Sequence, residues 1–220
     1  MDELKLQALE ELLKELQTIL SEIRSQKSTP ELNLKVFFDL VRKKLFNGRL
    51  STSQVSGMEA KIKAFQDSNF PLSWAAYCLA TSYHETARKM QPVREGLSAS
   101  DTWRRRNLRY YPYYGRGDVQ LTWKANYEKA DRELDLDGKL ISDLDLALDP
   151  DISANIMVRG MTEGWFTNKK LSDYLPKEDG SKLQFKNARR IINSTDRDNL
   201  IAGHALIFQE ALKEAGWVSR

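Results

Sequence analysis

The segment Tyr113-Tyr114-Gly115-Arg116-Gly117-Asp118-Val119-Gln120-Leu121-Thr122-Trp123 combines tyrosines, a Gly-Arg-Gly turn and an alternation of apolar and polar residues. Glycine tolerates positive φ and close backbone approach, so the two glycines indicate a tight turn. In an extended chain, Val119, Leu121 and Trp123 would lie on one side and Gln120 and Thr122 on the other. Aromatic rings beside a carboxamide and a hydroxyl suit a hydroxyl-rich ligand such as a sugar. The alternative is an aromatic turn that closes a small hairpin.

Two further parts of the chain carry related patterns. Tyr83-His84-Glu85-Thr86 ends an apolar helix and precedes Gln91-Pro92-Val93-Arg94-Glu95, and the C-terminal part holds Gly164-Trp165-Phe166-Thr167 and Ala188-Arg189-Arg190-Ile191-Ile192-Asn193. With the tyrosine-glycine segment, these blocks resemble, in the same order over residues 31–217, glycoside hydrolase family 19. That family contains plant-type chitinases and many bacteriophage endolysins. The resemblance implies a mainly α, lysozyme-like helical domain with a small β-hairpin.

The composition narrows the class of protein. The chain has 220 residues, 41% of them hydrophobic, which suits one large domain or one domain with an appendage. A formal charge of +3 is too small for a dedicated nucleic-acid binder, and we expect no nucleic-acid partner. Cys78 is the only cysteine, so no intramolecular disulfide can form. Plant chitinases of the family are rich in disulfides, and the chain therefore resembles the phage branch.

The location of the protein is predicted from its apolar segments. No run of eighteen apolar residues is present, so we expect no stable membrane insertion. The N-terminus lacks a basic region followed by an apolar one, so no signal peptide is expected. Together with this expectation, the resemblance to phage endolysins implies synthesis in the host bacterial cytoplasm. The resemblance implies action on the cell wall in the periplasm after release, a step that commonly depends on a holin.

Residues 2–27 have the pattern of one long amphipathic helix. Leucine and isoleucine recur at heptad-like spacing at Leu9, Leu12, Leu16, Ile19 and Ile23, with Leu13 and Leu20 widening the stripe. Its net charge is −2, which argues against binding to anionic membranes. Ser25 to Pro30 reads as a break, so the predicted domains are residues 1–29 and the catalytic domain 30–220. Three alternatives remain for the stripe: packing on the catalytic domain, self-association through residues 4–23, or an appended segment foreign to the family domain.

The rest of the chain reads as mostly helical. The first expected helix runs from residue 31 to a stop at Asn47-Gly48. Ser53 is the expected cap of the next helix, which reaches Gln66, and Pro71 begins one that runs to Arg88. Residues 101–123 read as irregular, with a short hairpin. Later helices are expected at 124–134, 151–163, 185–193 and 197–215.

Glu85 is the candidate general acid. Glycosidic hydrolysis needs one group to protonate the leaving oxygen and a second on the other side of the bond. The helical pattern buries one face of the helix over 72–88, and Cys78, Ser82 and Glu85 fall on an adjacent stripe of small and polar residues. A carboxyl placed there, partly desolvated beside aromatic rings, suits the acid role. The alternative is a solvated glutamate at a helix end.

Glu95 is the candidate general base. It lies ten residues after Glu85, which is about 15 Å along a continuous helix. An inverting pair needs a separation of roughly 6.5–9.5 Å. Pro92 makes a continuous helix unfavourable, so a turn would bring Glu95 back. Plant-type members place the second carboxylate further along the chain, so Asp101 stays an alternative base, and Glu95 could instead pair with a nearby arginine.

The remaining site residues follow from the resemblance. It implies that Thr122 holds the attacking water, that Gln120 contacts the sugar N-acetyl region, and that Asn126 and Asn193 line the substrate site. His84 would orient Glu85 or the substrate, and Tyr114 and Arg116 belong to the sugar-binding turn. The alternatives are local capping for the asparagines and a core position for His84. Arg116-Gly117-Asp118 spells an adhesion tripeptide, but we interpret it as part of this turn.

No cofactor and no metal are expected. A catalytic zinc needs three protein ligands, and the chain has only two histidines, His84 and His204, and one cysteine, Cys78. The sequence therefore argues against a zinc enzyme. Asp135-Leu136-Asp137-Gly138 lacks the ligand series of a calcium loop. Trp103-Arg104-Arg105-Arg106 is too small a cluster to indicate nucleic-acid binding, and is better interpreted as contacting acidic glycan stems or Asp101.

The sequence therefore predicts a glycosidase. The main hypothesis is a metal-independent endolysin that hydrolyses β-1,4 bonds of peptidoglycan by an inverting acid/base mechanism, for host lysis. One alternative is a chitinase acting on N-acetylglucosamine polymers. The other is a non-catalytic glycan-binding or phage structural module.

Overall fold

The protein is mainly helical, with one two-stranded antiparallel sheet. The computed structural model describes residues 3–26 and 32–219. This architecture confirms the predicted class of a helical domain with a small β element and a long N-terminal helix. The main elements are α1 (Glu3–Gln26), α2 (Leu34–Leu45), α3 (Thr52–Asp67), α4 (Leu72–Glu85), β1 (Val93–Arg94), α5 (Asp101–Asn107), β2 (Arg116–Gly117), α6 (Lys124–Glu133), α7 (Lys139–Ser142), α8 (Pro150–Glu163), α9 (Lys182–Ala188) and α10 (Asp198–Glu214). Short 3-10 turns η1 (Leu144–Leu148), η2 (Leu171–Asp173) and η3 (Arg189–Ile191) connect them.

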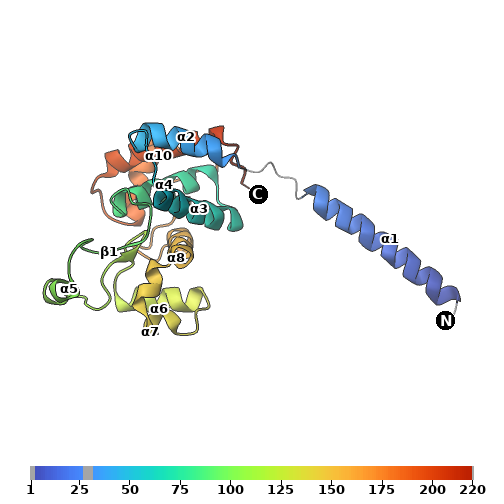
Figure 1. The fold of residues 1–220 in the computed structure, drawn as a ribbon, viewed down its shortest axis with the longest axis horizontal. Coiled ribbons are helices and arrows are strands. Elements are labelled where there is room, and N and C mark those ends of the chain that lie inside the picture. Colours follow the sequence, from blue (N-terminus) through green and yellow to red (C-terminus); the bar gives the residue numbers. More distant parts are fainter. Residues whose placement is uncertain (1–2, 27–31, 220) are drawn as a thin grey trace.

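Helix α4 is the centre of the core. Every residue from Ala75 to Tyr83 is buried, so the helix is covered on all sides rather than along one stripe. Helix α10 packs along it, and α2 and α9 pack on α10 (Figure 1). Sequence analysis had assigned Cys78 and Ser82 to a less buried face of α4. Both are fully buried, because α10 and neighbouring segments cover that side too.

A second group of elements lies below this helical core in Figure 1. It contains α6 and α7, which pack together, and η1, which packs on α7, α8 and β2. Helix α8 also packs on α3 and so joins this group to the core. The sheet pairs Val93 with Gly117 and Arg94 with Arg116, and Arg116 forms a further antiparallel bridge with Leu121.

The predicted hairpin needs a correction. Sequence analysis placed it within residues 101–123, whereas the strand that pairs with β2 comes from residues 93–94. Residues 101–107 form the unpredicted helix α5, whose cap is Ser100, the acceptor of a hydrogen bond from the Trp103 amide. The local bridge from Arg116 to Leu121 is the only part of the expected hairpin that the described residues form.

Helix caps explain most of the boundaries. Ser51, and not the predicted Ser53, caps α3, because its hydroxyl accepts from the amide of Gln54 while the Gln54 side chain accepts from the Ser51 amide. Asp149 caps α8, which ends at Gly164 with φ of 79°. Helices α6, α8 and α10 lie close to their predicted ranges.

Two predicted ends are wrong. The helix expected to reach Arg88 stops at Glu85, because Ala87 and Arg88 have positive φ. The helix expected over 185–193 is the shorter α9 followed by the 3-10 turn η3. Both changes occur beside candidate site residues.

Helix α1 stands apart from the other helices (Figure 1). Its predicted helical character is confirmed over Glu3–Gln26, and Ser25 lies inside the helix rather than in a linker; the rest of the expected linker is outside the described residues. Six large apolar side chains are 47–60% exposed: Leu9, Leu12, Leu13, Leu16, Ile19 and Leu20. These six side chains of the stripe are therefore uncovered in the single chain. Over the described part of the chain, no helix combines the length and apolar character needed to span a bilayer.

Candidate functional site

Side-chain contacts join the three motif blocks that are separate in the sequence. The hydroxyl of Ser82, at the end of α4, donates to Asp118 in the Gly-Arg-Gly turn over 2.7 Å. Arg189, in the C-terminal block, donates to Glu85. The backbone amide of Glu95 donates to the Gly115 carbonyl, and the Glu95 carboxylate accepts from the Gly115 amide. The Gly-Arg-Gly turn and the C-terminal block therefore both contact the end of α4, and Glu95 contacts the same turn at Gly115.

Glu85 is the last residue of α4 and is partly buried. Nη1 of Arg189 donates to its Oε1 over 2.7 Å, and Nε of Arg189 donates to the carbonyl of Asp196 over 3.0 Å. Arg189 is only 1% exposed. A buried guanidinium held by a second hydrogen bond fixes the direction in which the Glu85 carboxyl points.

The segment after Glu85 has an unusual backbone. Ala87, Arg88 and Met90 all have positive φ, a region that residues with a β-carbon rarely adopt. The hydroxyl of Thr86 helps to hold this conformation, because it donates to the Ser82 carbonyl and accepts from the Met90 amide. Such strain collects at functional sites, where the surrounding structure maintains it.

Glu95 is held by hydrogen bonds to both carboxylate oxygens. Oε1 accepts from the Tyr110 hydroxyl over 2.8 Å, and Oε2 accepts from the Gly115 amide over 2.9 Å. A β-carbon at position 115 would lie 3.1 Å from Oε2 of Glu95 and 2.8 Å from Oε1 of Gln120. The close approach of the amide to the carboxylate thus favours glycine. Two donors leave each oxygen a further lone pair for a substrate or water.

Gln120 and Thr122 form the polar side of the turn. The Gln120 amide nitrogen donates to the carbonyls of Val93 and Gly117, both over 3.0 Å, so this side chain fastens the turn to β1. Its Oε1 lies at Gly115, close to the Glu95 carboxylate. The Thr122 hydroxyl donates to the Gln120 carbonyl over 2.7 Å, which leaves its oxygen able to accept a hydrogen bond from water.

The two predicted asparagines make local contacts. Nδ2 of Asn126 donates to the Thr122 carbonyl over 2.8 Å and so supports the segment that carries the Thr122 hydroxyl. Asn193 is exposed, and its Oδ1 accepts from the Ser194 amide over 2.8 Å. Its own amide donates to the Arg189 carbonyl, which places Asn193 one turn after the partner of Glu85.

His84 is partly buried next to Glu85. Burial lowers the pKa of its imidazole below 6.5, although the Glu85 carboxylate acts in the opposite direction. His84 is therefore neutral at pH 7. A neutral imidazole can both donate and accept, as either the orienting role or the core role requires.

Trp123 corrects the predicted alternation of the turn. Val119 and Leu121 are buried as expected, whereas Trp123 is 47% exposed. Gln120 and Trp123 have positive φ, so the segment is not a regular extended strand and the indole turns outward. The Trp123 ring contacts Tyr110 at 4.9 Å between centroids and carries Arg109 at 5.3 Å. It offers an open aromatic face of the kind that the tyrosines were expected to supply.

Tyr114 and Arg116 are buried beneath the turn. The Arg116 guanidinium lies 3.7 Å from the centre of the Tyr114 ring, and Arg104 lies over the same ring at 5.3 Å. Arg116 also donates to Asp145 over 2.8 Å and to the hydroxyl of Tyr127. Through these contacts the two side chains stabilise the turn. The Tyr114 ring is covered and is not available to stack on a sugar.

A buried ion pair underlies the turn. Lys61 and Asp118 are fully buried and 2.8 Å apart, and Asp118 also accepts from the hydroxyls of Ser82 and Ser153. Lys61 donates further to the carbonyls of Gly57 and Met90. The Arg-Gly-Asp tripeptide is therefore an internal anchor between α3, α4 and α8, in agreement with its interpretation as part of the turn.

Asp101, the alternative base, lies on the exposed start of α5. Its carboxylate accepts from the Tyr111 hydroxyl over 3.1 Å. Glu95 is less exposed, and its carboxylate contacts the Gly115 segment directly. In the described part of the chain, no group of three His, Cys, Asp or Glu side chains is arranged to hold a metal ion.

Sequence analysis missed several residues of this site. Arg189 was inside a quoted block, but its partner Glu85 is 104 residues away, and no local pattern reveals that contact. Tyr110 and Lys61 likewise act through distant partners. The signal for Arg189 was limited to its place beside Asn193 in the C-terminal block.

Comparisons with known proteins give limited similarity. No protein-family model matches the chain, and no curated protein matches it. Among solved structures, the chain is similar to a bacterial family 19 chitinase described as differing from plant enzymes, with a TM-score of 0.49 and 20% sequence identity. The alignment covers 86% of this chain and 96% of that chain. The candidate site therefore rests on its own geometry.

Proposed function

We propose that this protein is a glycoside hydrolase that cleaves β-1,4 bonds of bacterial peptidoglycan, with Glu85 as general acid and Glu95 as general base. The observation that carries the proposal is that two carboxyl groups, those of Glu85 and Glu95, are each held in place by specific hydrogen-bond donors. Arg189 holds Glu85, while Tyr110 and the Gly115 amide hold Glu95. Fixed carboxyl groups in a partly buried setting are what acid/base hydrolysis of a glycosidic bond requires.

Arg189 supports the acid step. A general acid becomes negatively charged as its proton passes to the leaving oxygen. The guanidinium 2.7 Å from Oε1 of Glu85 is already oriented and buried, so it would stabilise that new charge without rearrangement. Arg189 is thus a positioning and electrostatic partner of the acid, and does not itself exchange a proton.

Glu95 and Thr122 support the water step. Glu95 accepts two hydrogen bonds and retains lone pairs that can take a proton from water. The Thr122 hydroxyl, whose proton points to the Gln120 carbonyl, can accept a hydrogen bond from the same water. Direct attack by a held water leaves no covalent intermediate and inverts the anomeric centre.

The biological setting of the proposal is host lysis by a phage-type endolysin. The sequence blocks and the single cysteine support the phage branch over the secreted plant enzymes. The protein would be made in the bacterial cytoplasm and would act on the wall in the periplasm after release. Peptidoglycan strands would then be its partner, with no cofactor and no nucleic acid involved.

Digestion of purified sacculi tests the proposed activity. We expect new reducing sugar ends, identified by mass spectrometry of the soluble products, and the same products in the presence of EDTA. The identity of the reducing sugar, N-acetylmuramic acid or N-acetylglucosamine, gives the bond cleaved. A 1,6-anhydro product would instead indicate a lytic transglycosylase that uses Glu85 alone.

Two other outcomes separate the alternatives. Release of oligomers from chitin, with sacculi untouched, would identify a chitinase. Binding to sacculi without release of any reducing end, by folded protein at high concentration, would identify a non-catalytic glycan-binding module. Either result would overturn the endolysin proposal.

A further inference from the structure

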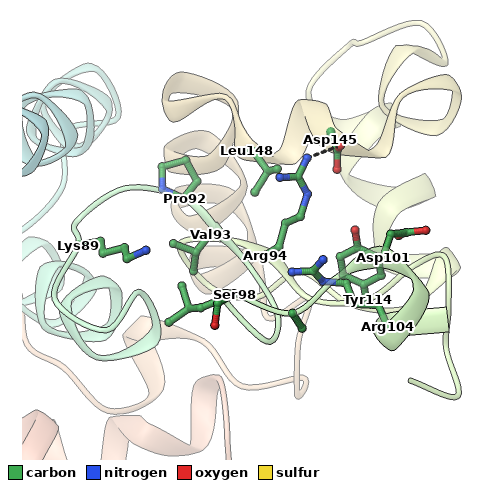
Figure 2. Close-up of a pocket in the computed structure, with 12 residues that line it drawn as sticks. Lys89, Pro92, Val93, Arg94, Ser98, Asp101, Arg104, Tyr114, Asp145 and Leu148 are labelled. Atoms are coloured by element: carbon green, nitrogen blue, oxygen red, sulfur yellow. Dashed lines mark hydrogen bonds and ion pairs between the residues drawn. The ribbon is translucent and has the colours of Figure 1, made fainter. Parts of the chain in front are cut away.

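A pocket of about 530 Å³ lies beside β1, next to the candidate active site. Its walls come from residues 89–104 together with Tyr114, Asp145 and Leu148 (Figure 2). One side is apolar, formed by Pro92, Val93 and Leu148. The rest of the lining includes five charged side chains: Lys89, Arg94, Asp101, Arg104 and Asp145. The pocket therefore suits a ligand with both small apolar groups and charge.

Arg104 is the buried cation of this pocket. It is 5% exposed, its Nε donates to the Glu95 carbonyl over 2.9 Å, and its guanidinium lies over the Tyr114 ring. Within residues 3–26 and 32–219, no group accepts a hydrogen bond from its Nη1 or Nη2. A buried guanidinium whose two terminal nitrogens have no partner is poised to bind a carboxylate through both.

Together with Arg104, the charged side chains that line the pocket leave an excess of one positive charge, because Lys89, Arg94 and Arg104 stand against Asp101 and Asp145. Arg94 and Asp145 form an ion pair at 2.5 Å, drawn as a dashed line in Figure 2, and Arg116 also donates to Asp145. Lys89 is exposed, has no ion-pair partner among the described residues, and points toward Val93 in Figure 2. Asp101 is the remaining acidic group in the lining.

We infer that this pocket binds the carboxylate of a short acidic peptide, and that the peptide is the stem attached to the glycan substrate. The inference rests on the proposed function for the peptide's source. The terminal nitrogens of Arg104 and the ammonium group of Lys89 would pair with carboxylates of the peptide. The apolar residues of the lining would contact the methyl groups of its alanines. An uncharged polymer such as chitin has no carboxylate to pair with these cations.

The pocket is coupled to the candidate base through the backbone. Val93 and Arg94 line it and directly precede Glu95, and Arg104 is hydrogen-bonded to the Glu95 carbonyl. Lys89 follows Glu85 by four residues. A bound stem would therefore lie along the strand that carries Glu95, and would favour peptide-bearing strands over bare glycan.

Calorimetric titration tests binding separately from catalysis. The probe is the stem tripeptide L-alanyl-γ-D-glutamyl-meso-diaminopimelate, compared with its trimethyl ester, which has no carboxylate. We expect the full-length protein to bind the free acid and to bind the ester at least about tenfold more weakly, the scale set by hydrogen bonds to charged groups. No binding of the free acid at millimolar concentration, or equal binding of both forms, would overturn the inference.

Two variants and a matched control locate the site. Lys89→Glu reverses an exposed, unpaired charge and should weaken tripeptide binding by about tenfold or more. Arg104→Lys keeps the charge but loses the fork, and should weaken binding to a similar extent. Lys139→Glu makes the same change of net charge at an exposed position on α7 and should bind like the wild type. If Lys139→Glu weakens binding as much as Lys89→Glu, the interaction is general attraction and the pocket is not the site.

Kinetics on two glycans complete the test. Sacculi stripped of stems by an amidase are compared with intact sacculi. Lys89→Glu should lower kcat/KM on stem-bearing strands and leave the stripped strands unchanged. If no glycan is cleaved but the tripeptide still binds in a Lys89-dependent way, the proposed function fails and the peptide site stands. If cleavage occurs with no preference for stems and no binding, the peptide site fails alone.

Discussion

Nη1 of Arg189 lies 2.7 Å from Oε1 of Glu85, a contact that joins residues 104 positions apart and fixes the candidate acid at the end of the central helix. Arg189 belongs to the C-terminal block and is buried. It also donates a hydrogen bond to the Asp196 carbonyl. The contact therefore links the acid to the block that contains η3 and Asn193.

Arg189→Met should reduce both activity and stability. The change removes the charge that faces Glu85, and leaves a partly buried carboxylate without its partner, which we expect to cost about 2–4 kcal/mol of unfolding free energy. Thermal melts and lysis of sacculi measure the two effects. Arg190→Met is the control, because Arg190 is exposed and, among the described residues, its side chain hydrogen-bonds only to Asn187.

The double variant makes this prediction specific to the pair. Glu85→Gln together with Arg189→Met removes both charges, so it should be less destabilised than the sum of the single changes. Additive losses would show that Arg189 stabilises the fold through other contacts and not through Glu85.

Thr122→Val should lower kcat more than it raises KM. The substitution keeps the shape of the side chain and removes the oxygen that is free to accept from water. An interaction made in the transition state affects kcat, whereas one made equally with bound substrate affects KM. Steady-state kinetics on soluble glycan chains separate the two. An effect confined to KM would reassign Thr122 to substrate binding.

Acid should destabilise the fold through His204. Burial lowers the pKa of His204 below 6.5, with the positive charges of Arg88 and His84 acting in the same direction, and its Nδ1 is buried without a partner. The unfolded chain then binds more protons than the folded chain below pH 6.5, so the unfolding free energy falls as the pH is lowered from there. Above pH 6.5 both states are neutral at this position, and the effect disappears.

His204→Phe tests this pH dependence. The ring contact with Tyr83, at 4.8 Å between centroids, can be kept by phenylalanine, while the titration is lost. The drop in melting temperature between pH 7.5 and pH 5.5 should be smaller in the variant than in the wild type. An identical drop in both proteins would mean that His204 does not contribute, and would leave His84, whose pKa is also lowered by burial, as the group to test next.

Sequence patterns predicted the parts of the fold that depend on local chemistry. The start and end of α8 follow from Asp149, Pro150 and Gly164, each of which acts within a few residues. Helix α5 was missed although Ser100 caps it, because its arginine-rich, aromatic composition resembles an irregular segment. The end of α4 was placed too late, since positive φ at Ala87 and Arg88 is not encoded by a glycine.

The candidate site was predictable only in part, for the same reason. Glu85, Glu95 and Thr122 were found through the resemblance of their blocks to a known family. Their supporting partners, Arg189 and Tyr110, are distant in sequence, and only the folded chain brings them near. The spacing of the aromatic residues did not show which ring is accessible to a ligand. In the structure the Tyr114 ring is covered and the Trp123 ring is exposed.

Deletion of residues 1–29 should prevent self-association and leave a monomer. We propose that a second copy covers the leucine stripe of α1, because exposed apolar side chains at heptad-like spacing are typical of helices that pair. Light scattering should show a smaller mass for the truncated protein, with unchanged cleavage per active site on soluble glycan. Leu16→Glu in the full chain should give the same oligomeric state as the truncation.

Other outcomes for α1 have different signatures. A full-length protein that is monomeric at high concentration contradicts self-association. If truncation leaves the mass unchanged and lowers the melting temperature, the helix packs on its own catalytic domain. If a folded truncation has no cleavage activity, the boundary at residue 29 is wrong.

The rate at which Glu85→Gln releases reducing ends from purified sacculi tests the central claim most directly. Glutamine keeps the volume and can still accept from Arg189, so the melting temperature should change little, while the proton donor is lost. General acid catalysis contributes typically ~10²–10⁴-fold, and we expect a loss of that size. A folded variant that retains more than about a tenth of the wild-type rate, well short of that typical contribution, would show that Glu85 is not the acid.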